Sequence, residues 1–206
     1  MHEELLPLFP LSVVLLPGTP LPLHIFEERY KEMIGEVMAG QSEFGVVLAS
    51  QEGIAQAGCT ATVEEVVQQY PDGRMDIVTY GRRRFSIQSL DDERAYLRAN
   101  VNFFDDEEAN TPATLRRQAM EACSGFQSPG ALDAGQPLLS FHLAASIEDL
   151  PFKQSILQSR SEADRLRRLI AYAPKYERTQ SRIRRLRETA PRNGHSQLPG
   201  SWKEDA

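Results

Sequence analysis

Two glycine-spaced stretches are the first places in this sequence where side chains could do chemistry. GEVMAGQS (35–42) and GIAQAGCT (53–60) both contain the GxxxxG spacing with which some loops cradle a nucleotide. Such a loop needs a lysine directly after its second glycine to reach the phosphates, but that position holds Gln41 or Cys59. The first stretch also ends a helical pattern instead of opening one, so no helix N-terminus would face a phosphate. Neither stretch predicts a nucleotide site.

Other catalytic and metal-binding patterns are missing. No GxSxG nucleophile elbow occurs, and HEELL near the N-terminus lacks the second histidine of an HExxH zinc site. Cys59 and Cys123 lie 64 positions apart without a CxxC pair, so they predict neither a zinc site nor a disulfide framework. His142 lies in an apolar segment, where a hydrogen-bonded core histidine is the favoured interpretation. We therefore expect no catalytic residue, no bound metal and no cofactor.

Charge is the remaining chemical signal. Residues 1–159 carry 11 Lys/Arg against 23 Asp/Glu, whereas residues 160–192 carry 11 against 4. Clustered arginines can bind the phosphates of RNA or an acidic partner, but only two tyrosines lie among them, too few for a base-stacking platform. A solvated helix face, or one docked on the acidic body, is favoured, and nucleic-acid binding is the alternative. The candidate residues are Arg165, Arg168, Arg182, Arg184 and Arg185.

The apolar stretch LFPLSVVLLPGTPLPLHIFEERY (8–30) invites comparison with a signal peptide or a membrane anchor. Glu3 and Glu4 give the preceding residues the wrong charge for a signal peptide. Repeated prolines prevent a spanning helix of about 20 residues, because each removes a backbone donor. No other segment is long and apolar enough. Together with the cysteine usage, this predicts a soluble cytoplasmic protein that does not bind a membrane.

Hydrophobic periodicity divides the same stretch into short elements. Residues 5–11 and 21–26 are predicted strands, joined by the turn residues PGTP. Beyond the second strand, apolar residues recur at helical spacing, which predicts an amphipathic helix ending near Gly40. Residues 44–49, FGVVLA, form a continuous apolar run that is typical of a buried strand.

A β-rich series follows. Segments 59–70, 74–90 and 95–104 are rich in β-branched residues or alternate between apolar and polar positions, and PDG between the first two is a hairpin signal. Gly81 divides the second segment into two strand-like pieces and indicates a bulge or a tight bend. Short strands at this spacing predict a small twisted barrel or closed sheet.

The pattern becomes helical after an acidic, proline-terminated break. Ser161 is a predicted N-cap, and Pro174 is predicted to interrupt the helix that follows. We place a β-rich subdomain at 1–107, a helical subdomain at 108–190 and a disordered tail at 191–206. The fold class is α+β: a small twisted β-barrel or sheet with one packed helix, followed by a C-terminal helical bundle.

The order of these features resembles a known family. LPLFPL (6–11), LLPG (15–18) and LPLHIFEERY (21–30) are similar to the opening of the amino-terminal, substrate-binding domain of the Lon proteases. LPFKQSILQSRSEADRLRRLI (150–170) resembles that domain's helical part, so the likeness spans roughly residues 5–172. Further motifs follow in the family's order at Phe44–Leu48, Gly58–Ala61, Asp72–Arg74, Gly81–Phe85 and Tyr96.

The resemblance implies a PUA-like β-barrel followed by a helical bundle. It also implies a non-catalytic, stand-alone form that lacks the ATPase and peptidase domains and binds unfolded polypeptide segments or a protein partner. Pro17 and Gly18 would form the turn before the second strand, and Leu21, Leu23 and Ile25 would alternate with Pro22, His24 and Phe26. The candidate partner-binding residues of this region are Leu16, Leu21, Leu23 and Phe26.

Overall fold

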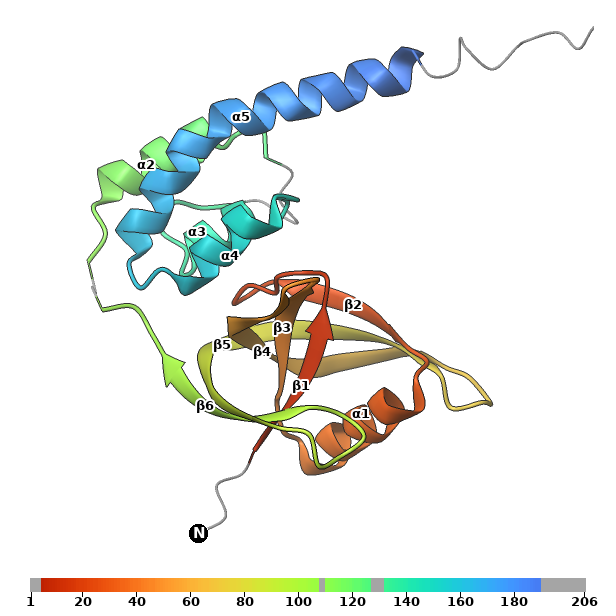
Figure 1. Cartoon of the computed structure of the whole chain (residues 1–206). Coiled ribbons are helices and arrows are strands. Elements are labelled where there is room, and N and C mark those ends of the chain that lie inside the picture. Colours follow the sequence, from red (N-terminus) through yellow and green to blue (C-terminus); the bar gives the residue numbers. More distant parts are fainter. Residues whose placement is uncertain (1–4, 108–109, 127–131, 190–206) are drawn as a thin grey trace, which may run out of the picture.

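The computed structural model describes residues 5–107, 110–126 and 132–189, which form a β-rich part and a helical part (Figure 1). The β-rich part holds one helix, α1, packed against a sheet, and the predicted α+β class is confirmed. Its elements are β1 (Leu6–Leu11), β2 (Pro20–Ile25), α1 (Glu28–Gly40), β3 (Phe44–Ser50), β4 (Gly53–Gln69), β5 (Met75–Asp91) and β6 (Arg98–Phe104).

These strands form one mixed sheet in the order β2-β5-β4-β3-β1-β6, and β6 also pairs with β5. The additional pairing curls the sheet until it closes on itself, as the sequence predicted. β1 and β3 run parallel, whereas the other pairings are antiparallel. One side of β5 pairs with β2 along its first half and with β6 along its second half. β2 therefore stands at an edge of the sheet.

Gly81 allows two chain segments to meet at very short range. The backbone N–H of Gly18 donates to the Gly81 carbonyl at 2.9 Å, and the Gly81 N–H donates to the Thr19 carbonyl at 3.0 Å. A Cβ at Gly81 would overlap the carbonyl oxygen of Leu16, so only glycine fits. The ladder with β4 shifts register here, but β5 continues through Gly81 as one strand instead of two pieces.

Helix α1 presents its apolar face to the interior of the sheet. The ring of Tyr30 packs against Phe9, with 4.1 Å between the ring centroids. Arg29 forms an ion pair with Glu27 on the solvent side. The helix ends where Gln41 adopts a left-handed conformation and its N–H bonds back to the last turn.

The helical part contains α2 (Ala113–Ala122), α3 (Leu139–Ala144), α4 (Leu150–Gln158) and α5 (Glu162–Thr189). The Ser161 hydroxyl accepts a hydrogen bond from the Asp164 N–H at 3.3 Å and so caps α5 as predicted. The predicted break at Pro174 is wrong, because α5 passes through it as one helix. Ala173 and Tyr176 are buried on either side of the proline, and this packing offsets the lost backbone hydrogen bond.

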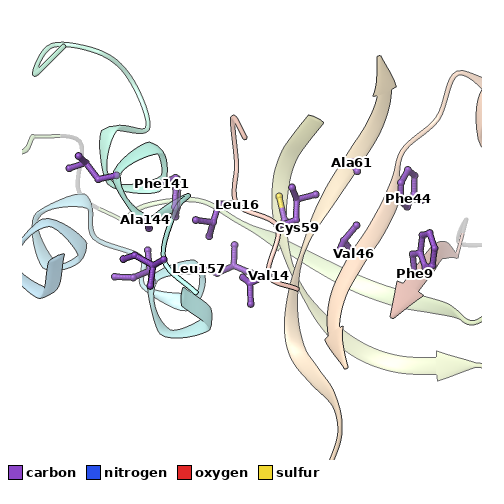
Figure 2. Packing of buried hydrophobic residues seen from close by; sticks show 14 of the residues in the cluster. Phe9, Val14, Leu16, Phe44, Val46, Cys59, Ala61, Phe141, Ala144 and Leu157 are labelled. Carbon is purple, nitrogen blue, oxygen red and sulfur yellow. The ribbon is translucent and has the colours of Figure 1, made fainter. Parts of the chain in front are cut away.

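The two parts share one hydrophobic core. Leu16, which precedes β2, packs between Phe141 of α3 and the sheet, and Val14 extends the contact toward Leu157 of α4 (Figure 2). The boundary placed at residue 107 remains a prediction, although β6 ends before it and α2 begins after it. The tail 191–206 lies outside the described residues.

Both cysteines are fully buried thiols, Cys59 in the sheet and Cys123 beside α2. Burial raises the pKa of each to about 12, so the reactive thiolate is scarce at neutral pH. We expect the native protein to react with a disulfide reagent such as dithiobis-nitrobenzoate at less than about a hundredth of the rate of free cysteine. In the control, both thiols should react promptly once about 6 M guanidinium has unfolded the protein. Fast labelling of the folded protein would contradict their burial.

Candidate functional site

Of the four apolar residues predicted to bind a partner, one is strongly exposed. The side chain of Phe26 is 58% exposed just after β2. Leu21 and Leu23 face inward and are half-buried against the core, because alternate residues of a strand point to opposite faces. Leu16 is only 1% exposed and lies in the core between the two parts, so it cannot contribute to a surface patch.

The outer side of β2 carries the exposed groups instead. Pro20, Pro22 and His24 alternate with the leucines and face solvent. The imidazole of His24 stacks on Phe26 at a centroid distance of 5.8 Å and meets the edge of the Tyr70 ring at 6.1 Å. We call Pro20, Pro22, His24, Phe26 and Tyr70 the β2 patch.

A carboxylate holds the polar groups of this patch in place. Asp76 of β5 lies 2.6 Å from His24 Nδ1 and accepts a 2.8 Å hydrogen bond from the Tyr70 hydroxyl. The hydrogen bonds from His24 and then Tyr70 lower the pKa of Asp76. Sequence reasoning missed Tyr70 and Asp76, yet both flank the predicted PDG turn, and the hairpin pairing makes them diagonal neighbours across the two strands.

Arg165 is the other predicted site residue that the structure buries. It is 1% exposed, and its guanidinium forms ion pairs with Asp106 at 2.5 Å and with Glu162 at 2.8 Å. Its Nε also donates to the Ser140 hydroxyl at 2.7 Å. Arg165 therefore joins α5 to α3 and to the segment after β6, and it is not available to an external anion.

Arg84 of β5 enters the same network from the sheet. It binds Asp106 at 2.7 Å and the Ser159 carbonyl at 2.6 Å. Burial by itself raises the pKa of Asp106, but the hydrogen bonds and charges of Arg165 and Arg84 outweigh it, and the net effect is a lowered pKa. Asp106 is thus shared by two buried arginines at the junction of the two parts, and Glu162 is the second carboxylate that binds Arg165.

The remaining arginine candidates lie on the surface of α5. Arg168 forms a 2.8 Å ion pair with Asp164 one turn away. Arg182, Arg184 and Arg185 are exposed on the distal part of α5, which extends beyond the other helices (Figure 1). The tyrosines of this helix face inward: Tyr172 stacks on Phe152 and Tyr176 packs on Phe126. No aromatic residue is interleaved with these arginines on the described surface of α5.

A groove of about 970 Å³ lies between α1, β1 and β6. Its charged groups pair with one another: Arg94 with Glu36 at 2.6 Å, and Arg98 with Asp91 at 2.6 Å. Hydrogen bonds from Tyr96 and then Arg94 lower the pKa of Glu36. These ion pairs compensate most of the charge on the groove walls, so the groove does not indicate a class of ligand.

His142 is hydrogen-bonded, as the sequence predicted, but it is half-buried and lies outside the fully buried core. Its ring nitrogens lie 3.0 Å from the Leu138 carbonyl and 3.1 Å from the Gly18 carbonyl, so it links α3 to the turn before β2. Within the described ranges no group of three His, Cys, Asp or Glu side chains is placed to hold a metal ion. Across the same residues, no helix has the length and apolar character to cross a bilayer.

Comparisons with known proteins agree with the geometry. Residues 5–173 match the family model of the ATP-dependent protease La (LON) substrate-binding domain. The Lon protease of Flavobacterium johnsoniae is 30% identical over 112 residues, which are 48% of this chain and 14% of that protein. The Lon protease of Parabacteroides distasonis is 26% identical over 111 residues, 50% of this chain and 14% of the relative. The matched segment thus spans about one seventh of these proteins.

Solved structures extend the likeness to both parts of the fold. A Lon N-terminal domain protein from Xanthomonas campestris aligns with a TM-score of 0.63 at 25% identity, covering 82% of this chain and 99% of that one. The N-terminal domain of the Mycobacterium avium complex Lon protease aligns with a TM-score of 0.60 at 17% identity, covering 83% and 98%, and supports the fold alone. The chain belongs to the LON substrate-binding domain family.

Proposed function

We propose that this protein binds unfolded polypeptide segments through the β2 patch and performs no chemistry on them. The exposed ring of Phe26, at 58%, is the observation that carries this proposal. A large aromatic side chain exposed beside two prolines loses contact with water when an apolar segment covers it. The match to a substrate-binding domain supports a polypeptide as the ligand.

The patch is suited to recognition because hydrogen bonds and ring stacking hold its side chains in one arrangement. Asp76 fixes His24 and Tyr70 by hydrogen bonds, and His24 in turn stacks on Phe26. A preorganised surface loses little conformational entropy when a partner binds. Pro20 and Pro22 add apolar surface, and their rings have no rotamer freedom to lose when a partner binds. These properties favour weak, repeated contacts with apolar segments of many sequences.

The substitution Phe26→Ser tests the proposal. Burying a phenylalanine side chain is worth about 1.5–3 kcal/mol, so we expect affinity for reduced, alkylated ribonuclease A to fall about 10- to 100-fold. The measurement is fluorescence anisotropy of the labelled, unfolded ribonuclease. Leu90→Ser is the matched control, because Leu90 is 51% exposed on β5 far from the patch. Equal losses in both variants, or no binding by the wild type, would refute the proposal.

RNA binding is the alternative candidate, supported by the exposed Arg182 and Arg184 on the protruding part of α5. The two functions respond differently to salt in the same assay. Contacts with an apolar patch tolerate added salt, whereas phosphate contacts weaken steeply with ionic strength. The double variant Arg182→Glu/Arg184→Glu tests this alternative. If a mixed-sequence single-stranded RNA binds the wild type but not the double variant, RNA binding is favoured.

A further inference from the structure

The distal half of β4 is a second free edge of the sheet. β3 pairs with β4 only between Gly53 and Ala61, while β5 pairs with it as far as Gln69. From Val63 to Gln69, therefore, β4 has a neighbouring strand on one side only among the described residues. Residues 64–69 are all exposed, on the hairpin that projects from the β-rich part in Figure 1. An unpaired strand edge presents a row of backbone donors and acceptors.

The two free edges differ in what they offer a polypeptide. Pro20 and Pro22 deprive the β2 edge of two backbone N–H groups, which blunts it against strand pairing. The segment 63–69 of β4, VEEVVQQ, contains no proline. Register shifts at Val63/Glu65 and Val66/Gln68 increase its twist. Only a short extended segment could follow such an edge.

A pocket of about 360 Å³ lies directly beside this edge. It is lined on one side by the end of α1, including Val37 and Met38, and on the other by Thr62–Val66 of β4. Met38 and Val66 are 41% and 37% exposed there. Strand addition obtains affinity from main-chain hydrogen bonds and specificity from such side-chain pockets. The pocket suits one apolar side chain of the added segment.

The charges at this edge indicate which segment fits. Glu64 is held by Arg82 and by the Thr62 hydroxyl, whereas Glu65 is exposed and takes part in no ion pair among the described residues. A second copy of this chain would add the same segment, VEEVVQQ, which contains neither lysine nor arginine and so offers Glu65 no opposite charge. A segment that carries lysine or arginine next to an apolar residue is complementary.

We infer that the β4 edge from Val63 to Gln69 accepts an extended, basic and apolar segment of an unfolded polypeptide as an added strand, with one apolar side chain in the Met38–Val66 pocket. This inference rests on the proposed function, since it names how and where such a ligand is held. It is distinct from the β2 patch, because the edge contributes backbone hydrogen bonds and the patch contributes apolar contact.

Hydrogen exchange locates the contact. Reduced, alkylated ribonuclease A, a basic unfolded chain, is added to the wild-type protein, and deuterium uptake is followed by mass spectrometry in fragments that cover residues 62–69. We expect the amides of this segment that point away from β5 to exchange rapidly in the free protein and at least about fivefold more slowly with the probe. Protection that grows with protein concentration in the absence of the probe would identify a second copy as the occupant and overturn the inference.

A pair of neighbouring substitutions tests the pocket. Val66→Lys places a charge in the pocket and should weaken ribonuclease binding at least about tenfold. Val67→Lys makes the same change one residue away, at a side chain that is 57% exposed and does not line the pocket. We expect it to change the affinity less than about threefold. Equal effects of the two substitutions would overturn the inference.

The outcomes separate this inference from the proposed function. If ribonuclease binds, Phe26→Ser weakens it, and residues 62–69 remain unprotected, the β4 inference is overturned while the proposed function stands. If the wild type binds no unfolded ribonuclease, the proposed function and the β4 inference are both overturned. Protection of residues 62–69 together with selective loss in Val66→Lys supports strand addition at β4.

Discussion

Replacing Asp106 with alanine is expected to lower the free energy of unfolding by about 3 kcal/mol. Asp106 is the shared counter-ion of Arg84 and Arg165, whose side chains are 5% and 1% exposed. Without it, Arg84 loses its carboxylate partner while Arg165 keeps only Glu162, and a buried charge left unpaired is costly. Because Asp106 itself is 26% exposed, water relieves part of the loss, and we expect the lower end of the range for such pairs.

Urea unfolding followed by circular dichroism measures this loss. The Asp106→Asn variant keeps the shape of the side chain and removes its charge, so it should recover only part of the stability. The control Glu28→Ala removes a carboxylate whose ion pair with Lys31 is on the surface, and it should change the free energy by less than about 1 kcal/mol. If Asp106→Ala lowered the free energy of unfolding no more than this control, the ion pairs of Asp106 would contribute little to stability.

The pH dependence of the same loss has a definite sign. The folded-state pKa of Asp106 is lowered, so its stabilising effect is fully present above the ordinary carboxyl pKa of the unfolded chain and disappears as the pH falls through the folded value. The difference in stability between the wild type and Asp106→Ala should therefore be constant near neutrality and narrow in acid.

Replacing Leu16 with alanine is expected to cost about 2–5 kcal/mol. Leu16 is 1% exposed and lies between Phe141 of the helical part and the sheet (Figure 2). Truncation removes buried methyl groups and leaves a cavity at the junction, where elements from both parts must keep their positions. The variant should unfold at a lower urea concentration in a single transition, since both parts share this core.

The same variant separates a structural role from a binding role. Well below its unfolding midpoint, Leu16→Ala should bind unfolded ribonuclease with nearly wild-type affinity per folded molecule, because Leu16 does not reach the surface. Leu90→Ala, an exposed leucine of β5, should change stability by no more than about 0.5 kcal/mol. A binding loss for Leu16→Ala comparable to that of Phe26→Ser would contradict the assignment of Leu16 to the core.

Local patterns predicted the fold well wherever neighbours in sequence determine the structure. The alternation in Leu21–Phe26 correctly divided this strand into two faces, although Leu21 and Leu23, predicted to bind a partner, belong to the inward face, and Ser161 caps its helix as expected. The same patterns could not show that β5 passes through Gly81 or that α5 passes through Pro174. Both continuities depend on tertiary packing, which overrides the local preferences of glycine and proline.

The candidate site was less predictable for the same reason. Arg165 appeared to belong to a basic surface because its main counter-ion, Asp106, lies 59 positions away. Leu16 appeared to belong to an exposed apolar patch because α3, which covers it, comes from a distant part of the sequence. Phe26 was identified correctly as exposed, because it follows a short strand whose alternation is visible in the sequence itself.

The closure of the sheet also sets an order of events during folding. Leu6 of β1 pairs with Ala99 of β6, which lies about ninety positions later in the sequence. β6 must also pair with the second half of β5. The hairpin β4–β5 can form early because its strands are adjacent in sequence, whereas the ring closes only after β6 has been synthesised. Until then β1 and the second half of β5 expose unpaired backbone groups. Large loop closure of this kind slows folding, so we expect the closure of the sheet to be a late step.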